Sequence, residues 1–264
     1  MPERNSEINK WALILGGSRG LGLATAQKLG ANGFNILLVH RDRKTELPGI
    51  EIEFGKIRAN GVKLASFNRD AVSQGVRSEI LREFEAILGK NGKIELLVHS
   101  LAKGAVKPMS GDGEKLTPED FLLTLDAMAV SWYAWTKDLL DLDLFAPDAM
   151  VLAFTSEGNT RPIQNYGAVS AAKAALEAIG RNMALEFAPR GIRVNCIQAG
   201  VTETRSFSMI PGSGEIKKFA MKRNPSGRLT LPEDVANVVY LLSREEARWI
   251  TGTVIKADGG ESLR

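Results

Sequence analysis

The 264-residue sequence has a single cysteine, Cys196, and only two histidines. One thiol excludes a disulfide within the chain, and so few histidine and cysteine side chains leave no cluster with the spacing of metal ligands, so we expect no metal. Cys196 lies inside the apolar run 194–197, where a buried and unreactive thiol is expected. His99 directly follows another apolar run, and we assign it a structural rather than a catalytic role.

The chain also lacks any apolar run of the roughly 18 residues that a membrane span requires. Its first ten residues, MPERNSEINK, are polar and do not resemble a leader. The charge is nearly balanced, because 34 basic and 31 acidic residues give a net charge of +3, and such a balance does not indicate nucleic-acid binding. We therefore expect a cytoplasmic protein with no membrane and no nucleic-acid partner.

Short apolar runs alternate with helical patterns along the whole chain. The runs that read as strands are 11–15, 35–39, 62–67, 94–98, 149–154, 193–197 and 253–256. With 44% hydrophobic residues and no break in composition, residues 1–264 are expected to form a single domain. The alternation predicts an α/β protein with a doubly wound parallel sheet, the Rossmann fold, of about seven strands with helices on both faces.

The run GGSRGLG at 16–22 joins the first strand to the first helical pattern. Glycines at 16, 20 and 22 allow a tight turn and let a pyrophosphate approach the backbone at the N-terminus of the helix. We therefore expect a dinucleotide cofactor here. The residues assigned to it from this loop are Gly16, Ser18, Arg19, Gly20, Leu21 and Gly22.

The residues after the second strand indicate which dinucleotide fits. A free ribose diol usually meets an acid at this strand end, whereas a phosphate on that ribose requires a cation. The first residues here are His40 and Arg41, and Arg19 of the glycine loop can face the same phosphate. This favours NADPH, while Asp42 keeps NADH as the alternative.

Other strand ends are expected to line the same crevice. Ser100, Leu101 and Ala102 follow the fourth strand, and Thr202 and Thr204 follow the sixth. The stretch 206–228 loses its periodicity and is rich in glycine, proline and cations, so we expect an irregular segment at about 201–228 that covers the substrate. Upstream, Thr117 is expected to cap a long helix.

The catalytic centre is expected in the segment 155–173, between a strand and an alanine-rich helix. Ser156 ends the strand, and Tyr166 and Lys173 are seven residues apart, which puts them on one face of a helix about 10 Å apart along its axis. A tyrosine can protonate a developing oxyanion if a nearby cation lowers its pKa, and lysine can supply that field while it binds a cofactor sugar. A serine hydroxyl can hold the same substrate oxygen.

These motifs together resemble the short-chain dehydrogenase/reductase family over nearly the whole chain. The resemblance rests on GGSRGLG, on VHSLA after the fourth strand, on Ser156, Tyr166 and Lys173, and on the terminal DGG. Within the family, the chain is similar to the divergent enoyl-[acyl carrier protein] reductases, which place six residues between the tyrosine and the lysine. In the commoner branch the tyrosine lies four residues before the lysine, where this chain has Val169.

The resemblance implies a role for each matching residue. Tyr166 would protonate the enolate oxygen, Lys173 would bind the nicotinamide ribose, Asn68 and Arg69 the adenine side, and Thr202 and Thr204 the carboxamide and phosphates. Two positions depart from the pattern. Met128 replaces the asparagine of the commoner branch, and Ser156 replaces the second tyrosine of many enoyl reductases, as it does in an NADPH-dependent isoform.

Three functions follow in order of preference. The first is NADPH-dependent reduction of an enoyl thioester in fatty acid synthesis, the second is reduction of a ketone or 3-oxoacyl thioester, and the third is a non-catalytic NADP-binding sensor. The resemblance also implies a homotetramer, for which we expect one helix face to meet its symmetry mate: Ala172, Leu176, Ile179, Met183 and Phe187. Four cations of the covering segment are expected to meet an acidic acyl carrier protein: Lys217, Lys218, Lys222 and Arg223.

Overall fold

The computed structural model describes residues 9–264, so most of the N-terminal stretch in which we expect no leader lies outside the described residues. These residues form one seven-stranded sheet in the order β3-β2-β1-β4-β5-β6-β7, and all neighbouring strands are parallel. The prediction of a doubly wound α/β fold is confirmed. The strands are β1 (Asn9–Leu15), β2 (Asn35–His40), β3 (Leu64–Asn68), β4 (Gly92–His99), β5 (Phe145–Ser156), β6 (Arg193–Ala199) and β7 (Val254–Ala257).

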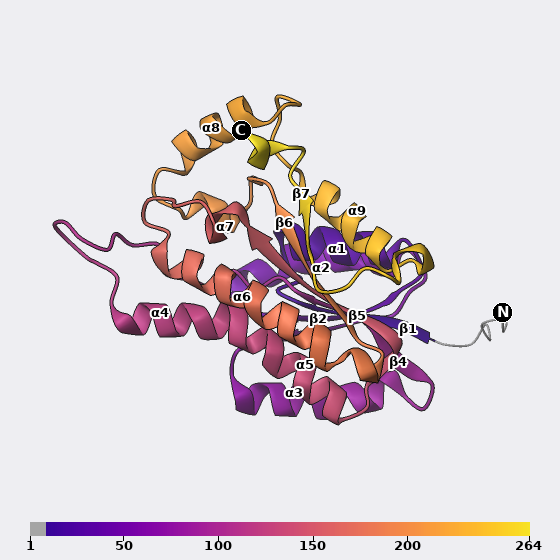
Figure 1. Ribbon diagram of the computed structural model, residues 1–264. Helices are drawn as coiled ribbons and strands as arrows, with labels where there is room; N and C mark the ends of the chain where they lie inside the picture. The colour runs from indigo at the N-terminus through magenta and orange to yellow at the C-terminus, as the bar shows by residue number, and fades with distance from the viewer. Residues whose placement is uncertain (1–8) are drawn as a thin grey trace.

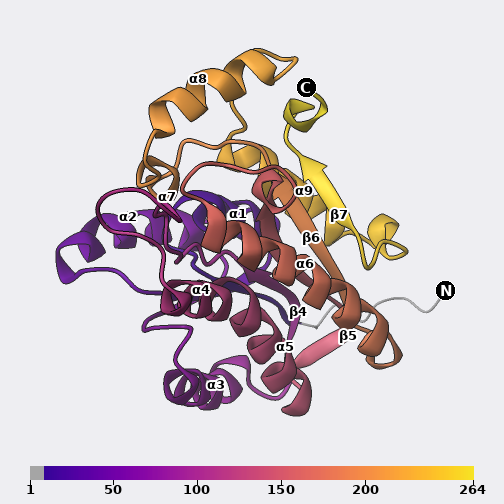
Figure 2. The ribbon, with the colours of Figure 1, turned by 60° about the vertical axis from the view of Figure 1, so that its left-hand side comes forward.

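Helices cover both faces of the sheet (Figures 1 and 2). On one face lie α1 (Gly20–Gly30), α2 (Leu47–Arg58) and α9 (Pro232–Leu242). On the other lie α3 (Gln74–Leu88), α4 (Pro118–Leu125), α5 (Ser131–Asp141) and α6 (Gly167–Glu186). The sheet order changes direction between β1 and β4, and this switch point opens a crevice at the carboxyl ends of the strands.

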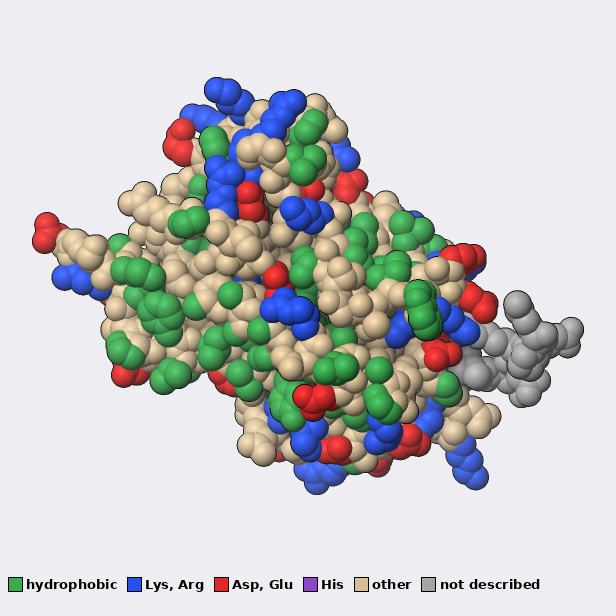
Figure 3. All heavy atoms as spheres, viewed as in Figure 1, with side chains coloured by type: hydrophobic (Ala, Val, Ile, Leu, Met, Phe, Trp, Pro, Cys, Tyr) green, Lys and Arg blue, Asp and Glu red, His purple; other side chains and the backbone are tan. Residues whose placement is uncertain are grey.

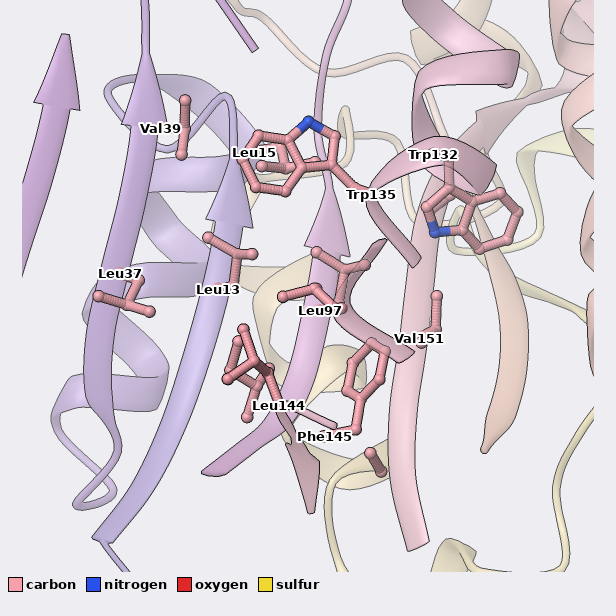
Figure 4. Packing of buried hydrophobic residues seen from close by; sticks show 14 of the residues in the cluster. Leu13, Leu15, Leu37, Val39, Leu97, Trp132, Trp135, Leu144, Phe145 and Val151 are labelled. Carbon is pink, nitrogen blue, oxygen red and sulfur yellow. The ribbon is translucent and has the colours of Figure 1, made fainter. Parts of the chain in front are cut away.

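The central strands are apolar on both faces because helices pack against both. Along β1, Leu13 and Leu15 belong to one core cluster, whereas Ala12 and Ile14 belong to the other. On the face covered by α3, α5 and α6, Trp132 and Trp135 lie over the strands (Figure 4). Such close packing on both faces fixes the strand ends that form the crevice.

The long helix predicted after Thr117 is continuous but contains a π-helical turn. Thr117 caps it as expected, since its hydroxyl accepts a hydrogen bond from the Asp120 amide at 3.2 Å. The π-helical turn Asp126–Val130 joins α4 to α5. Single π-helical turns of this kind often occur near functional sites, and this one contains Met128, which lines the main cavity.

Two expectations about regular structure are wrong. The stretch 206–228, expected to be irregular, contains the end of α7 (Arg205–Ser208) and all of α8 (Ser213–Arg223). The apolar face of α8 is short and interrupted by lysines, which hides its periodicity in the sequence. In addition, α6 starts at Gly167, so Tyr166 is the N-cap residue rather than part of the helix.

The α6 face that we expected to meet a symmetry mate is mostly buried within the chain. Ala172, Leu176 and Met183 are at most 3% exposed, because α6 packs against the sheet and α5. These three side chains therefore have almost no surface to offer a second copy and the assignment is wrong for them, whereas Ile179 and Phe187 of the same face are partly exposed. Within residues 9–264, no helix is both long and apolar enough to cross a membrane.

Candidate active site

Tyr166 lies where the chain turns into α6. The preceding residue, Asn165, has a positive φ of 62°, a conformation that asparagine tolerates better than most residues. The Tyr166 carbonyl accepts the Ser170 amide at 2.8 Å and thereby starts the helix. The side chain is half-buried in the cavity wall, and burial raises the pKa of its phenol above the ordinary value. The phenol is therefore protonated at neutral pH, as a proton donor must be.

Ser156, at the end of β5, is next to this phenol. Its hydroxyl partly offsets the effect of burial on the Tyr166 pKa, although the two groups do not form a well-aligned hydrogen bond. The Ser156 Oγ atom is buried and has no hydrogen-bond partner among the described residues. A buried hydroxyl without a partner is costly, so Ser156 is prepared to bind a ligand atom in the cavity that it lines.

Lys173 lies two turns into α6 with its amine fully enclosed. The side chain is 7% exposed, and Nζ donates a hydrogen bond to the Phe154 carbonyl at 2.6 Å. Burial lowers the pKa of this amine to about 8, although Cys196 and Glu177 nearby favour its charged form. We expected this cation to lower the pKa of Tyr166, but Lys173 does not do so. Burial of the phenol raises the pKa instead.

His99 lies buried under the same region without a catalytic role of its own. Burial and the Lys173 charge lower its pKa to about 3, so the imidazole stays neutral. Its Nε2 atom lies 2.8 Å from the Ser131 hydroxyl, which in turn donates to the Ala127 carbonyl.

Val169, four residues before Lys173, lies in an apolar environment. Val169 and Met128 are both almost completely buried and form a small cluster with Ala172. The π-helical turn holds Met128 in this cluster. A side chain at this place can shape the cavity but cannot donate a proton, so acid chemistry here depends on Tyr166 and Ser156.

The glycine loop has the shape of a phosphate cradle. Gly16 has a φ of +85°, and a Cβ atom added to it would lie 2.5 Å from the Ser100 carbonyl oxygen. A Cβ at Gly22 would collide with the Gly16 carbonyl. No described side chain caps the N-terminus of α1, so its amides can bind an anion. The residues of this loop therefore fit a dinucleotide pyrophosphate.

At the adenine end, an ion-pair network surrounds Asp42. Its carboxylate receives hydrogen bonds from Arg19 Nε at 3.2 Å and from His40 Nδ1 at 2.8 Å. Burial raises the pKa of Asp42, but hydrogen bonds from Ser18, His40 and Arg19 outweigh burial, so the pKa is lowered overall. Arg19 also pairs with Glu46 at 3.2 Å.

The placement of His40 differs from our prediction. Its side chain is only 3% exposed and lies edge-on against Phe54 of α2, so it cannot meet a ribose phosphate in the crevice. Arg41 does project into solvent, with 65% of its side chain exposed and an ion pair to Asp70. Of the three cations predicted for this end, Arg19 and Arg41 are therefore the accessible ones.

Asn68 and Arg69 hold the loops around the adenine end. The Asn68 amide bonds both backbone groups of Asp42, at 2.8 and 3.1 Å. Arg69 turns outward to Glu83 at 2.6 Å. Asp70, which we did not assign, pairs with Arg41 and lies near Lys103; its place just after β3 was the available sequence signal, since strand ends face the crevice.

A cavity of about 570 Å³ lies between these strand ends and the helices α7 and α8. It is lined by the three predicted catalytic residues and by six further residues predicted to bind the cofactor: Leu21, Ser100, Leu101, Ala102, Thr202 and Thr204. Apolar side chains of the stretch 201–220 form the roof: Val201, Phe207, Met209, Ile210, Ile216 and Phe219. An apolar cavity with a few polar groups at one end suits a hydrocarbon chain that carries one reactive carbonyl.

Arg223 anchors the roof to the catalytic strand. This nearly buried guanidinium donates to both Glu157 oxygens, at 2.6 and 2.8 Å, and to the carbonyls of Glu261 and Arg264, at 2.9 and 2.7 Å. Glu157 directly follows Ser156, so the end of α8 and the end of β5 share one ion pair. The expectation that Arg223 meets a carrier protein is wrong, because these bonds occupy a buried side chain.

The remaining roof cations lie on the surface of α8, at the top of Figure 3. Lys217 pairs with Glu203 at 2.7 Å and Lys218 with Glu215 at 2.9 Å. Lys222 is exposed. All three face solvent, where surface pairs are weak and exchange partners readily.

Comparisons with known proteins agree with this geometry. A family described as Enoyl-(Acyl carrier protein) reductase matches residues 16–262. The enoyl-[acyl-carrier-protein] reductase [NADH] FabI of Enterococcus faecalis is 28% identical over 97% of this chain and 98% of its own. The dehydrogenase/reductase SDR family member 4 of Sus scrofa is 28% identical over 97% of this chain and 88% of its own. The crystal structure of the enoyl-[acyl-carrier-protein] reductase (NADH) of Aquifex aeolicus superposes with a TM-score of 0.82, at 25% identity, over 97% of both chains.

Proposed function

Since the chain belongs to the enoyl-(acyl carrier protein) reductase family of the short-chain dehydrogenases/reductases, we propose that it reduces the carbon–carbon double bond of an enoyl thioester with NADPH. It is an oxidoreductase whose fold binds a nicotinamide cofactor. One observation carries the finer proposal. The only phenol of the described residues that lines the cavity is Tyr166, seven residues before Lys173, while the position four residues before it is filled by apolar Val169.

The bound nicotinamide supplies a hydride, which in enoyl reduction enters the β-carbon. Negative charge then collects on the thioester oxygen, two carbons further along, so the proton donor must stand further from the hydride path than in ketone reduction. Tyr166 precedes the commoner tyrosine position by three residues, which corresponds to about 4.5 Å along a helix. As the N-cap residue, Tyr166 still begins that helix through its carbonyl, so this offset supports donation to the thioester oxygen.

Each polar group then has a defined task. Tyr166 donates its proton to the thioester oxygen, and Ser156, whose hydroxyl has no other partner among the described residues, hydrogen-bonds the same atom. Lys173 would bind the nicotinamide ribose and favour the charge that develops on the phenol. The glycine loop and α1 would hold the pyrophosphate.

The choice of NADPH rests on Arg19 and Arg41. Both are accessible at the adenine end, whereas the acid that would suit a free ribose diol, Asp42, is nearly buried and already bonded by Arg19 and His40. A ribose phosphate would draw Arg19 and Arg41 from their carboxylate partners. Two of the relatives named above have NADH in their names, so cofactor choice is a property to measure on this chain.

The experiment compares NADPH oxidation by the parent protein with an enoyl thioester and with a 3-oxoacyl thioester of equal chain length. We expect turnover of the enoyl substrate and poor turnover of the 3-oxoacyl one. Tyr166→Phe should lower enoyl turnover by about a hundredfold or more if the phenol supplies acid catalysis. Efficient ketone reduction without measurable enoyl turnover would overturn the assignment.

Ketone or 3-oxoacyl reduction is the second candidate because of Ser156. This serine lies seventeen residues before Lys173, the spacing of the serine in the commoner branch, and a 3beta-hydroxysteroid dehydrogenase of Eggerthella lenta is 27% identical to this chain. The same pair of assays separates the two candidates. A non-catalytic sensor would bind NADPH but turn over neither substrate.

We further propose that an acyl carrier protein delivers the substrate to the roof cations Lys217, Lys218 and Lys222. Exposed cations on a rim mainly accelerate encounter with an acidic partner, so their effect should fade with added salt. Turnover of carrier-bound substrate should therefore fall with salt more steeply than turnover of the same acyl group on coenzyme A. Equal salt dependence would remove the support for this partner.

We also propose a homotetramer, and exposed apolar side chains of α4, α5 and α6 offer a surface for it. Exposed apolar side chains gather over α4 (Figure 3), where Leu122 and Leu123 are each 66% exposed. Tyr133 of α5 and Leu185 of α6 are 41 and 76% exposed. Contiguous exposed apolar side chains favour burial against another protein surface. Light scattering at micromolar concentration tests this, and a monomer would contradict it.

A further inference from the structure

We propose that Gly158 is a positioning residue that sets where the Tyr166 phenol stands, and that it acts on catalysis only through that ring. Gly158 is buried in the turn after β5, two residues beyond Ser156, and lies eight residues before Tyr166 in the chain. The inference rests on the proposed proton donation by Tyr166. It assigns to a residue without a side chain the task of defining the donor's position.

The contact between Gly158 and the ring is closer than any side chain would allow. A Cβ atom built on Gly158 would lie 2.7 Å from Tyr166 Cε1 and 2.9 Å from Cδ1. Carbon atoms in ordinary contact are about 3.5–4.0 Å apart, so an alanine here would have to push the ring away by roughly 1 Å. Ile163 limits the available space on the same side, at 3.4 Å from that Cβ.

The backbone around Gly158 is itself held in place. The Ser170 hydroxyl, one turn into α6, donates a hydrogen bond to the Gly158 carbonyl. The Ser170 amide bonds the Tyr166 carbonyl at 2.8 Å. Ser170 therefore connects the turn that carries Gly158 to the helix start that carries Tyr166, and neither can move without the other.

The need for glycine here does not come from backbone conformation. Gly158 is absent from the residues with positive φ, so an L-residue could adopt its backbone angles without strain. The atoms nearest to a side chain added at Gly158 belong to the Tyr166 ring, followed by Ile163. An alanine at 158 is therefore a selective probe of the position of the ring.

The ring position determines which substrate oxygen can receive the proton. A displacement of about 1 Å can lower a rate by about a hundredfold when reacting groups must align. Moving the ring off Gly158 would also change its distance from Ser156, the hydroxyl that offsets part of the burial effect on the Tyr166 pKa. Gly158 thus affects both the reach and the acidity of the donor.

The test is a double-mutant cycle with Gly158→Ala and Tyr166→Phe, measured as kcat and KM for the enoyl thioester and as the Kd for NADPH. We expect Gly158→Ala to lower kcat by about ten- to a hundredfold, with KM and Kd changed less than about threefold. In the Tyr166→Phe background, the same change should lower kcat by less than about twofold, because the phenol through which Gly158 acts is gone. An undiminished loss in that background would show a merely structural effect and overturn the inference.

Gly55→Ala is the matched control. Gly55 lies in α2 with no atom within 4 Å of an added Cβ, so kcat should stay at the parental value. If Gly158→Ala does not fold, Ser170→Ala takes its place. It releases the Gly158 carbonyl and should lower kcat about three- to tenfold, again only when Tyr166 is present; parental kcat in Ser170→Ala would then reject the inference.

A crystal structure of Gly158→Ala separates this inference from the proposed function, because it requires no substrate. We expect the Tyr166 ring to be displaced while the rest of the cavity superposes on the parent. A displaced ring in a protein whose parent lacks enoyl turnover would sink the proposed function alone. An undisplaced ring in a protein whose parent reduces enoyl thioesters would sink this inference alone.

Discussion

The two ends of the crevice use cations in opposite ways. At the substrate end, Lys173 and Arg223 are 7 and 8% exposed, and fixed hydrogen bonds hold each of them. At the adenine end, the side chains of Arg19 and Arg41 are 39 and 65% exposed, and the carboxylates of Asp42 and Asp70 pair with them. Burial makes the ion pair of Arg223 costly to break and the charge of Lys173 costly to hold, whereas Arg19 and Arg41 can exchange their partners for a ligand phosphate at little cost.

The largest expected effect comes from breaking the buried cluster at the substrate end. Arg223→Met removes the hydrogen bonds to Glu157, Glu261 and Arg264 and leaves Arg161, among the described residues, as the remaining side-chain donor to Glu157, and breaking a buried ion pair costs about 3–5 kcal/mol. We expect urea unfolding to show a loss of this size. Limited proteolysis should also cut α8 faster, since this bond cluster holds the end of the helix.

Arg228→Met is the matched control for this change. Arg228 also binds a carboxylate with two nitrogens, at 2.6 and 3.1 Å to Asp234, but it is exposed, with 54% of its side chain in solvent. An exposed pair is worth about 0–1 kcal/mol. If both variants lost the same stability, the contrast between the buried and exposed cations would fail.

Lys173→Met should sharpen the contrast by raising stability while it abolishes activity. Burial lowers the pKa of Lys173 from 10.5 to about 8, which corresponds to a cost on the order of 3 kcal/mol for the charged folded form. Loss of the bond to the Phe154 carbonyl offsets about 1 kcal/mol of the gain. A net gain of about 2 kcal/mol at pH 7 is therefore expected from urea unfolding, at the expense of turnover.

The pH dependence of this gain has a definite sign. Between about pH 8 and 10.5, the unfolded parent chain keeps a proton on Lys173 that the folded chain has lost, so the stability of the parent rises with pH across this window. The advantage of Lys173→Met should be largest below pH 8 and vanish above 10.5. Lys137→Met, which removes an exposed lysine paired with Asp141, should show no such step, and a step in that control would contradict the explanation.

The smallest expected effect is at the adenine end. Arg41→Ala should lower the specificity constant for NADPH by roughly ten- to a hundredfold, about 1.5–3 kcal/mol in binding of the ribose phosphate, and leave NADH use unchanged. Stability should change by less than 1 kcal/mol, because the pair with Asp70 is exposed. Arg58→Ala, in an exposed pair on α2, should alter neither constant. Equal NADPH and NADH constants in the parent would contradict the assigned preference.

The architecture could be predicted because it depends on short-range patterns. Each strand of a sheet buried on both faces must be apolar throughout, as Leu37, Leu38 and Val39 are in β2. The helices between the strands show their own period. Helix α8 was not predicted because it is half-exposed and rich in lysine, so only a few residues of one face show the helical spacing of apolar side chains. It is also preceded by Gly212, which has a left-handed φ of 79°.

The site was predictable where it is local and unpredictable where it is not. Ser156, Tyr166 and Lys173 lie at one strand end and along the following helix, so their proximity follows from strand-to-helix geometry. Arg223 and Glu157 are 66 residues apart, and no pattern along the chain connects them. Burial of His40 was not predicted because it also depends on a contact that is distant in the sequence. A polar residue at a strand end is expected to face the crevice, but here Phe54 of α2 covers the His40 ring.

The reactivity of Cys196, the single cysteine of the sequence, can report opening of the protein core. Cys196 is 3% exposed in β6, and burial raises its pKa to about 12, so an alkylating reagent cannot react with it while α6 covers this face of the sheet. Labelling therefore requires that α6 separates from the sheet, and its rate depends on how often that happens. No engineered probe is needed, because the sequence contains one cysteine and every labelled molecule has therefore opened at this one site.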